Sequence, residues 1–141
     1  MQSKHGFETT GQRSALMAKI KSNNTKAEVK LRKALFAKGM RFRVNNSSLF
    51  GKPDISIKKF KLVIFIDGEF WHGYNWDQKK EKIITNRAYW IPKIERNINR
   101  DLLVNDYYYK LGWTLFRFWE KEVNRNLDGC VNEVLNFVKS L

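Results

Sequence analysis

The run "LVIFI" at residues 62–66 is the feature of this 141-residue sequence that most limits the fold. Its five consecutive apolar residues suit a central β-strand that is covered on both faces, since a strand with one solvated face alternates apolar and polar residues. A membrane-spanning helix requires about 20 apolar residues, so this run is too short to be one. The sequence therefore predicts a buried strand with other elements packed on both of its faces.

Helical and strand patterns surround this central strand. The clearest helix lies within "TKAEVKLRKALFAKG", where Thr25 is the N-cap, Glu28 completes a capping box and Gly39 ends the helix. The capping box alone would explain why a glutamate stands at position 28, without any role in catalysis. In chain order, the other predicted elements are a short helix from Ser14, strands at 41–45, 53–59 and 61–66, a helix at 91–110 with Pro92 in its first turn, a buried strand at 113–119 and a closing helix.

These elements predict an α/β fold in which helices flank a small mixed β-sheet. The strand at 53–59 alternates apolar and polar residues, so it is expected to be half exposed. The strand at 113–119 follows a long crossover helix and is expected to lie parallel to a neighbour. Residues 1–12 are expected to be a flexible lead-in and residues 13–141 one domain, since no Pro, Gly or Ser-rich linker divides the chain. The single cysteine, Cys130, lies in the apolar pattern of the closing helix and is expected to be buried.

The charge of the chain indicates its partner. Lys and Arg number 27 against 14 Asp and Glu, which gives a formal net charge of +13. So basic a domain favours a polyanion, and nucleic acid is favoured over a membrane because no long apolar run is present. The N-terminal sequence lacks the apolar core of a signal peptide, so we expect a cytoplasmic protein. The segment 79–100 is strongly basic, and its Lys79 and Lys80 are expected to contact DNA.

Acidic residues and a histidine stand at the ends of two neighbouring predicted strands. Asp54 enters one strand, and the next strand ends in Asp67, Glu69 and His72. Carboxylate oxygens suit a hard cation such as Mg²⁺, and a histidine with a pKa near neutrality can activate water for attack on phosphorus. The alternatives are structural, because Asp54 could pair with Lys52 or cap a turn, and Asp67 before a glycine is common in turns.

Aromatic residues follow the central strand in "FWHGYNW". The adjacent Phe70 and Trp71 cannot both face one core if the backbone is extended, because neighbouring side chains then point to opposite sides. In a basic protein, exposed rings can stack on bases or wedge between them, and Trp90 could join them. The alternative is that these rings cover the open side of a small sheet.

Five motifs resemble, in order and spacing, the very short patch repair (Vsr) endonucleases. They are "RSALMAKIKSNNTKAEVKLRKAL", "RFRVNNSSLFGKPDISI", "VIFIDGEFWHG", "YWIPKIERNINRD" and "LGWTLFRFWE". The resemblance covers about residues 13–125 and is more specific than any single motif. It implies a restriction-endonuclease-like three-layer sandwich and Mg²⁺-dependent hydrolysis of a phosphodiester on the 5′ side of the thymine in a T:G mismatch.

The resemblance also assigns roles to matching residues. Asp54 of "GKPD" matches the metal-binding aspartate, and Ile66 matches a second ligand through its backbone carbonyl. His72 of "FWH" matches the general base, and Asp101 of "NRD" matches the carboxylate that orients it. Glu28 matches an acidic residue near the active site.

Five further residues match the part of the family that contacts DNA. Phe70, Trp71 and Trp90 match the aromatic residues that wedge into the duplex beside the mismatch. Lys93 and Asn97, one turn apart on one face of the basic helix, match the residues that read the T:G pair.

The sequence departs from the family pattern where relatives carry a structural zinc. The matching positions hold Glu69, Tyr74, Trp76 and Lys121, which cannot replace thiolate and imidazole ligands, so we expect this zinc to be absent. Packing of Tyr74 and Trp76 is expected to hold the loop instead. Asp67 stands where a family member has a histidine, and it could supply a further carboxylate near the metal.

The function predicted from these residues is a mismatch-directed nicking endonuclease that acts on double-stranded DNA. Two alternatives stay open: a nuclease of the same fold without mismatch specificity, and a mismatch-binding module that has lost catalysis. We expect a monomer that associates with the bacterial nucleoid when bound to DNA, with mismatch-repair proteins as possible partners and without a membrane.

Overall fold

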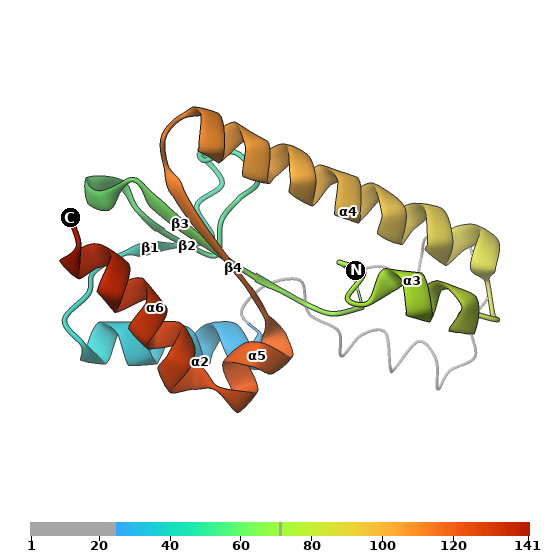
Figure 1. The fold of residues 1–141 in the computed structure, drawn as a ribbon, viewed down its shortest axis with the longest axis horizontal. Coiled ribbons are helices and arrows are strands. Elements are labelled where there is room, and N and C mark those ends of the chain that lie inside the picture. The colour runs from blue at the N-terminus through green and yellow to red at the C-terminus, as the bar shows by residue number, and fades with distance from the viewer. Residues whose placement is uncertain (1–24, 71) are drawn as a thin grey trace.

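The computed structural model describes residues 25–70 and 72–141. The predicted lead-in, the short helix from Ser14 and the aromatic residue Trp71 lie outside these residues. The described elements in chain order are α2 (Lys26–Ala37), β1 (Arg43–Val44), β2 (Ile55–Ile57), the 3₁₀ helix η1 (Lys58–Phe60), β3 (Leu62–Asp67), α3 (Trp76–Lys79), the 3₁₀ helix η2 (Lys80–Lys82), α4 (Arg87–Lys110), β4 (Thr114–Trp119), α5 (Glu120–Arg125) and α6 (Leu127–Lys139) (Figure 1).

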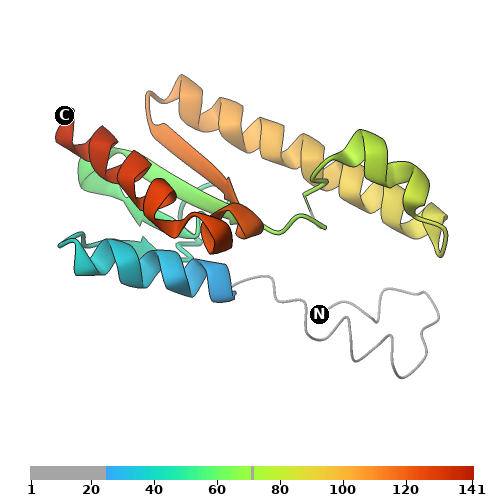
Figure 2. The ribbon, with the colours of Figure 1, turned by 60° about the horizontal axis from the view of Figure 1, so that its bottom comes forward.

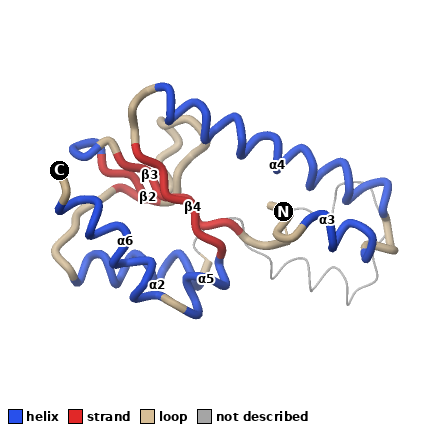
Figure 3. Tube along the Cα trace, in the orientation of Figure 1, coloured by secondary structure: helices blue, strands red, loops and turns tan. Residues whose placement is uncertain are grey.

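The four described strands form one mixed sheet in the order β1-β2-β3-β4 (Figure 3). The first three are antiparallel neighbours, whereas β4 returns through the long helix α4 and pairs parallel to β3, with Leu62 opposite Thr114 and Asp67 opposite Trp119. This confirms the predicted parallel pairing, which a crossover helix requires.

Helices cover both faces of this sheet, with α4 on one side and α2, α5 and α6 on the other (Figures 1 and 2). The alternation of side chains along β3 separates two cores. Ile64 faces the larger core with Leu31 of α2 and Val134 of α6, whereas Val63 and its neighbour Phe65 face α4. The predicted three-layer α/β sandwich is confirmed.

The central strand is fully buried, as predicted, since every residue of β3 is buried. The expectation of a half-exposed strand at 53–59 is wrong, because β2 is only three residues long and all three, including Ser56, are buried. An isolated serine tolerates burial between two neighbouring strands, so alternation misled here. The strand β4, expected to be buried, is mostly half-buried because it lies at the edge of the sheet.

Two helical boundaries also differ from expectation. α4 begins at Arg87, so Pro92 lies in its second turn rather than its first and removes one helical hydrogen bond. The closing helix is interrupted at Asn126, whose side chain accepts a hydrogen bond from the Gly129 amide and starts α6. Cys130 on α6 is buried as predicted, and burial raises the pKa of its thiol to about 11. Among the described residues, no helix has the length and apolar character needed to cross a bilayer.

Candidate active site

The ends of β2 and β3 meet at one end of the sheet. Ile55 lies opposite Ile64 in the antiparallel pair, so the register places Asp54 opposite Phe65, next to Ile66. The backbone amide of Ile66 donates a hydrogen bond of 2.7 Å to Oδ2 of Asp54. The expectation that the hairpin brings Asp54 and the end of the next strand together is confirmed.

The electrostatic environment of Asp54 favours a cation. Burial and, after it, the nearby carboxylate of Glu28 raise the pKa of this carboxyl from 3.8 to about 8, against the lowering effect of the hydrogen bond from Ile66. The ion pairs formed by residues 25–70 and 72–141 do not include Asp54. A divalent ion would supply the missing positive charge, and a carboxylate with a carbonyl oxygen is a donor set that Mg²⁺ accepts.

Glu28 has the structural role that the sequence predicted. Its backbone amide donates to Thr25 Oγ1 at 3.3 Å, and its carboxylate accepts from the Thr25 amide at 3.2 Å. The carboxylate is buried and also pairs with Arg32 at 3.2 Å. Glu28 is therefore a capping-box residue that in addition lies close enough to Asp54 to raise its pKa.

His72 is oriented by α4. Its Nδ1 atom lies 2.5 Å from Oδ2 of Asp101, so the predicted pair is formed. Gly73 follows at φ +70°, and a Cβ atom there would lie 2.4 Å from Cδ1 of Ile98 on α4. This close approach requires glycine and fixes the loop against the helix. Burial lowers the pKa of His72, but the hydrogen bond to Asp101 and the nearby carboxylates outweigh it and raise the pKa overall.

Asp67 lies on the α4 face of the sheet and is buried. Nη1 of Arg117 donates to both of its oxygens, at 3.0 and 2.9 Å. Burial raises the pKa of Asp67 against the opposing effects of His72 and Arg117. Asp67, His72 and Asp101 could each offer a metal ligand, with the ligand atoms within 4.8 Å of one another. The guanidinium already supplies positive charge there, so this trio fits a cation less well than Asp54 does.

The aromatic residues predicted to wedge into DNA lie at the junction of the loop and α4. Phe70 is 41% exposed, and its ring packs edge-on against Trp90 with centroids 5.1 Å apart. Trp90 is only 4% exposed and belongs to a small core with Ile94. The structure therefore presents the ring of Phe70 at the surface and places Trp90 behind it.

The basic residues predicted to contact DNA lie on α3, η2 and α4. Lys93 and Asn97 are one turn apart on α4, and both are half-buried. Lys79 is exposed, with its ammonium 5.3 Å from the ring centroid of Tyr74. Lys80 instead forms an ion pair of 2.8 Å with Glu95. Lys79 is thus more available to a phosphate than Lys80.

The four residues at the zinc positions of the family make other contacts. Glu69 accepts a hydrogen bond of 2.9 Å from the backbone amide of Lys121, and the Lys121 ammonium lies 3.7 Å from the ring centroid of Tyr74. Tyr74 also packs edge-on against Trp119 at the end of β4. Trp76 donates through Nε1 to Glu95 at 3.0 Å. Ring packing thus ties this segment to β4, the cation–π contact ties it to α5, and the hydrogen bond of Trp76 ties it to α4.

Comparison with known proteins gives the family. The model of the family described as DNA mismatch endonuclease Vsr matches residues 7–78. The chain is 47% identical over 131 residues to the type II nicking enzyme V.NmeDIP of Neisseria meningitidis serogroup C, covering 93% of this chain and 88% of that protein. It is 52% identical over 111 residues to the type II nicking enzyme V.HpaIIP of Haemophilus parainfluenzae, covering 79% of each.

The chain belongs to the Vsr family. A more distant relative, the DNA mismatch endonuclease Vsr of Escherichia coli K12, is 34% identical over 108 residues, which cover 77% of this chain and 69% of that protein. The predicted resemblance is confirmed, and with it the class of the protein, a DNA endonuclease.

Two residues of this Vsr-family site were not predicted from the sequence. Arg117 lies in the middle of an apolar strand, and a charge in such a run was the available signal for an internal ion pair. Glu120 directly follows the strand end at Trp119; burial raises its pKa, as do the carboxylates of Glu69 and Glu28. Because β3 and β4 are parallel, their ends share one edge, which was the signal for Glu120.

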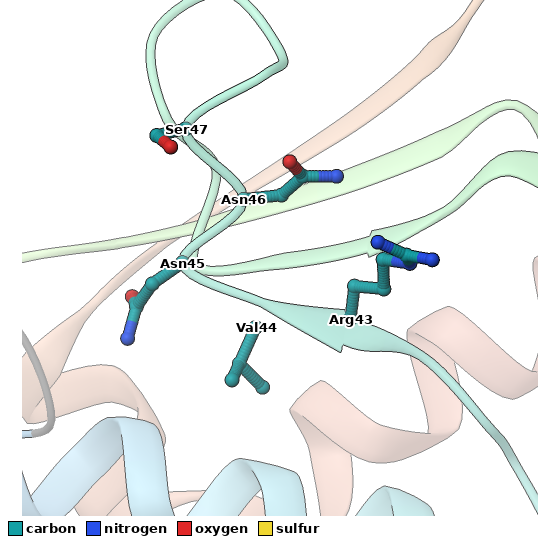
Figure 4. A pocket seen from close by; sticks show the side chains of 5 residues that line it. All are labelled: Arg43, Val44, Asn45, Asn46 and Ser47. Atoms are coloured by element: carbon teal, nitrogen blue, oxygen red, sulfur yellow. The ribbon is translucent and has the colours of Figure 1, made fainter.

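A polar hollow of about 380 Å³ lies at β1 and the turn that follows it (Figure 4). The backbone amide of Asn45 donates to the carbonyl of Asp54 at 3.1 Å, which connects this turn to the residue before β2. Oδ1 of Asn46 accepts from the amide and hydroxyl of Ser48 at 3.0 and 2.6 Å. The hollow is lined by Arg43, Val44, Asn45, Asn46 and Ser47, none of which was predicted as a site residue.

Proposed function

We propose that this Vsr-family protein is a Mg²⁺-dependent endonuclease that nicks one DNA strand beside a T:G mismatch. The observation that carries the proposal is the shared position of Asp54, with its raised pKa, and the His72–Asp101 pair near one end of the sheet. An exposed Phe70 and the basic helix α4 lie beside them. The names of the relatives, which refer to nicking and to mismatches, agree with it.

In the proposed reaction, Asp54 and the carbonyl of Ile66 hold the ion. Bound Mg²⁺ would polarise the scissile phosphate and stabilise the charge that develops on it. The neutral imidazole of His72 takes a proton from the attacking water at Nε2, while Asp101 holds Nδ1 and stabilises the imidazolium that forms. Glu28 acts on Asp54 by raising its pKa.

DNA binding in the proposal divides between shape and sequence. The exposed ring of Phe70 would enter the duplex beside the mismatch, with Trp90 behind it and Trp71 as its predicted neighbour. Lys93 and Asn97 would contact the mismatched bases, and Lys79 a phosphate. We further expect a cytoplasmic monomer that is joined at the nick by mismatch-repair proteins.

The test compares two labelled duplexes of identical sequence, one with T:G and one with T:A, incubated with Mg²⁺ and the full chain. The proposal expects one nicked strand in the T:G duplex, and no nick with EDTA or with Asp54→Asn. Equal cleavage of both duplexes would favour a nuclease without mismatch specificity. Tight binding of the T:G duplex with no cleavage in Mg²⁺ or Mn²⁺ would favour a binding module.

Base contacts and phosphate contacts respond differently to mutation. Lys93→Ala or Asn97→Ala should lower the preference for T:G over T:A by about 1–3 kcal/mol. Lys79→Ala should weaken binding to both duplexes equally and reduce its salt dependence. Lys80→Ala should have the smaller effect, since its ammonium is paired with Glu95. Equal losses on both duplexes for Lys93 and Asn97 would remove them from the mismatch contact.

A further inference from the structure

Arg117 is held in place by contacts that do not involve the acidic residues of the site. Its guanidinium lies over the ring of Phe65 on β3, 4.4 Å from the centroid. Its Nε donates to Oδ1 of Asn105 on α4 at 3.0 Å. Contacts with β3 on one side and α4 on the other thus position the guanidinium independently of the carboxylates.

One amino group of this fixed guanidinium engages both carboxylates around His72. Nη1 donates to Oδ1 and Oδ2 of Asp67 at 3.0 and 2.9 Å, and it lies 3.6 Å from Oδ1 of Asp101. Arg117 therefore determines where Asp67 can be, and it shares Asp101 with His72.

The imidazole of His72 has a carboxylate near each nitrogen, but at unequal distances. Nδ1 is 2.5 Å from Oδ2 of Asp101, whereas Nε2 is 3.7 Å from Oδ1 of Asp67, which is beyond hydrogen-bond distance. If Asp67 approached Nε2, both nitrogens would donate to carboxylates, and the imidazole would be held as imidazolium with no lone pair for a proton.

We propose that Arg117 is a positioning residue that holds the carboxylate of Asp67 away from Nε2 of His72 and so keeps that nitrogen available to a water molecule. This inference rests on the proposed function, in which His72 is the base. It predicts that Arg117 acts on His72 through Asp67, and not only as a nearby positive charge.

A double-mutant cycle read by NMR tests this route. The chain has two histidines, so a His5→Gln background leaves His72 as the one imidazole. The charged groups facing His72 are Asp67 at the end of β3, Asp101 on α4, Arg117 on β4 and Glu120 at the start of α5. The readout is the pH midpoint of the imidazole ¹⁵N signals, together with the nitrogen that carries the proton in the neutral form.

Arg117→Met should raise this midpoint by about one unit or more, because Asp67 becomes free to bond Nε2. In an Asp67→Asn background the same change should have much less effect, since no carboxylate remains to approach. Equal shifts in both backgrounds would show a purely through-space charge effect and overturn the proposal. If Arg117→Met does not fold, Arg117→Gln removes the same charge and enters the same cycle.

Nicking of the T:G duplex gives a second readout. Arg117→Met should lower kcat by about 10- to 100-fold with the Kd for DNA unchanged, and adding it to Asp67→Asn should cost little more. Arg41→Met is the matched control, because Arg41 also stacks on a phenylalanine, Phe36, at 3.9 Å. It should leave the His72 midpoint unaltered.

The two readouts separate the inference from the function on which it rests. If the parent nicks no duplex, the proposed function fails while the NMR cycle still decides the role of Arg117. If the parent nicks and the NMR cycle is additive, the inference alone fails.

Discussion

Asp54 and Asp67 lie near the same end of one sheet, yet the groups that surround their two carboxylates carry different charges. Asp67 receives two hydrogen bonds from Arg117, so the protein itself supplies the compensating cation. Asp54 receives one from a backbone amide, but burial and the adjacent carboxylate of Glu28 outweigh it, so the pKa of Asp54 rises to about 8. The difference teaches that a carboxylate alone does not indicate a metal site. The stronger indication is a carboxylate that has no positively charged side chain beside it.

The two aspartates should therefore differ most in catalysis. Asp54→Asn removes the proposed metal ligand and should lower the nicking rate by about 10³-fold, which corresponds to several kcal/mol of transition-state stabilisation. Asp67→Asn should cost about 10-fold, because it disturbs only the surroundings of His72. Single-turnover nicking of a T:G duplex at saturating protein measures both. A larger loss for Asp67→Asn would reverse the assignment of the two groups.

The second largest difference between the two aspartates should be in the pH dependence of the stability of the metal-free protein. Because Asp54 has a folded pKa near 8 and an ordinary pKa of 3.8, the parent should lose stability as the pH rises through this window. Asp54→Asn lacks this loss, so its advantage over the parent should grow by at most about 1.4 kcal/mol per pH unit. Urea unfolding in EDTA at pH 5 and pH 8 is the measurement. Asp67→Asn breaks the bonds to Arg117 and should be less stable than the parent at both pH values.

The pH dependence of the reaction offers a smaller effect. The pKa of His72 is raised, since its bond to Asp101 and the charges of both carboxylates outweigh burial, and activity should rise as the base loses its proton. Asp67→Asn removes one of these charges and should move the acidic limb of kcat/KM to lower pH, by about one unit or less. An unmoved limb would mean that Asp67 does not act on the base.

The smallest effect concerns the loop that follows His72, where the ammonium of Lys121 makes a cation–π contact with Tyr74. Tyr74→Leu keeps an apolar side chain but removes the ring face beneath Lys121, and it should cost about 0.5–2 kcal/mol of stability. In buffer without added Mg²⁺, EDTA should leave the Tm of the parent unchanged, because this loop is expected to hold no zinc. A fall in Tm with EDTA that zinc restores would contradict that expectation.

Much of the fold could be predicted because local patterns and global topology agree. Thr25 and Glu28 marked the start of α2, the run 62–66 marked the central strand, and the crossover through α4 fixed a parallel β4. The burial of Ser56 and the second-turn position of Pro92 could not be predicted, because tertiary packing decides both.

The sequence predicted which residues belong to the candidate site better than it predicted how their charges are paired. Asp54, His72 and Asp101 came from motifs, and the structure brings His72 and Asp101 into contact. The pairing of Asp67 with Arg117 joins residues 50 positions apart and depends on the register between β3 and β4. A sequence alone does not give that register, so the role of Arg117 emerged only from the structure.

The central claim is that Asp54 binds a divalent metal ion, whereas the charge of Asp67 is already compensated by Arg117. Calorimetric titration of the metal-free protein with Mn²⁺ at pH 7, in two buffers of different ionisation enthalpy, tests it most directly. A pKa of about 8 leaves Asp54 mostly protonated at this pH, so binding should release close to one proton per ion in the parent and in Asp67→Asn, and none in Asp54→Asn. Undiminished proton release by Asp54→Asn, or its loss in Asp67→Asn, would contradict the account.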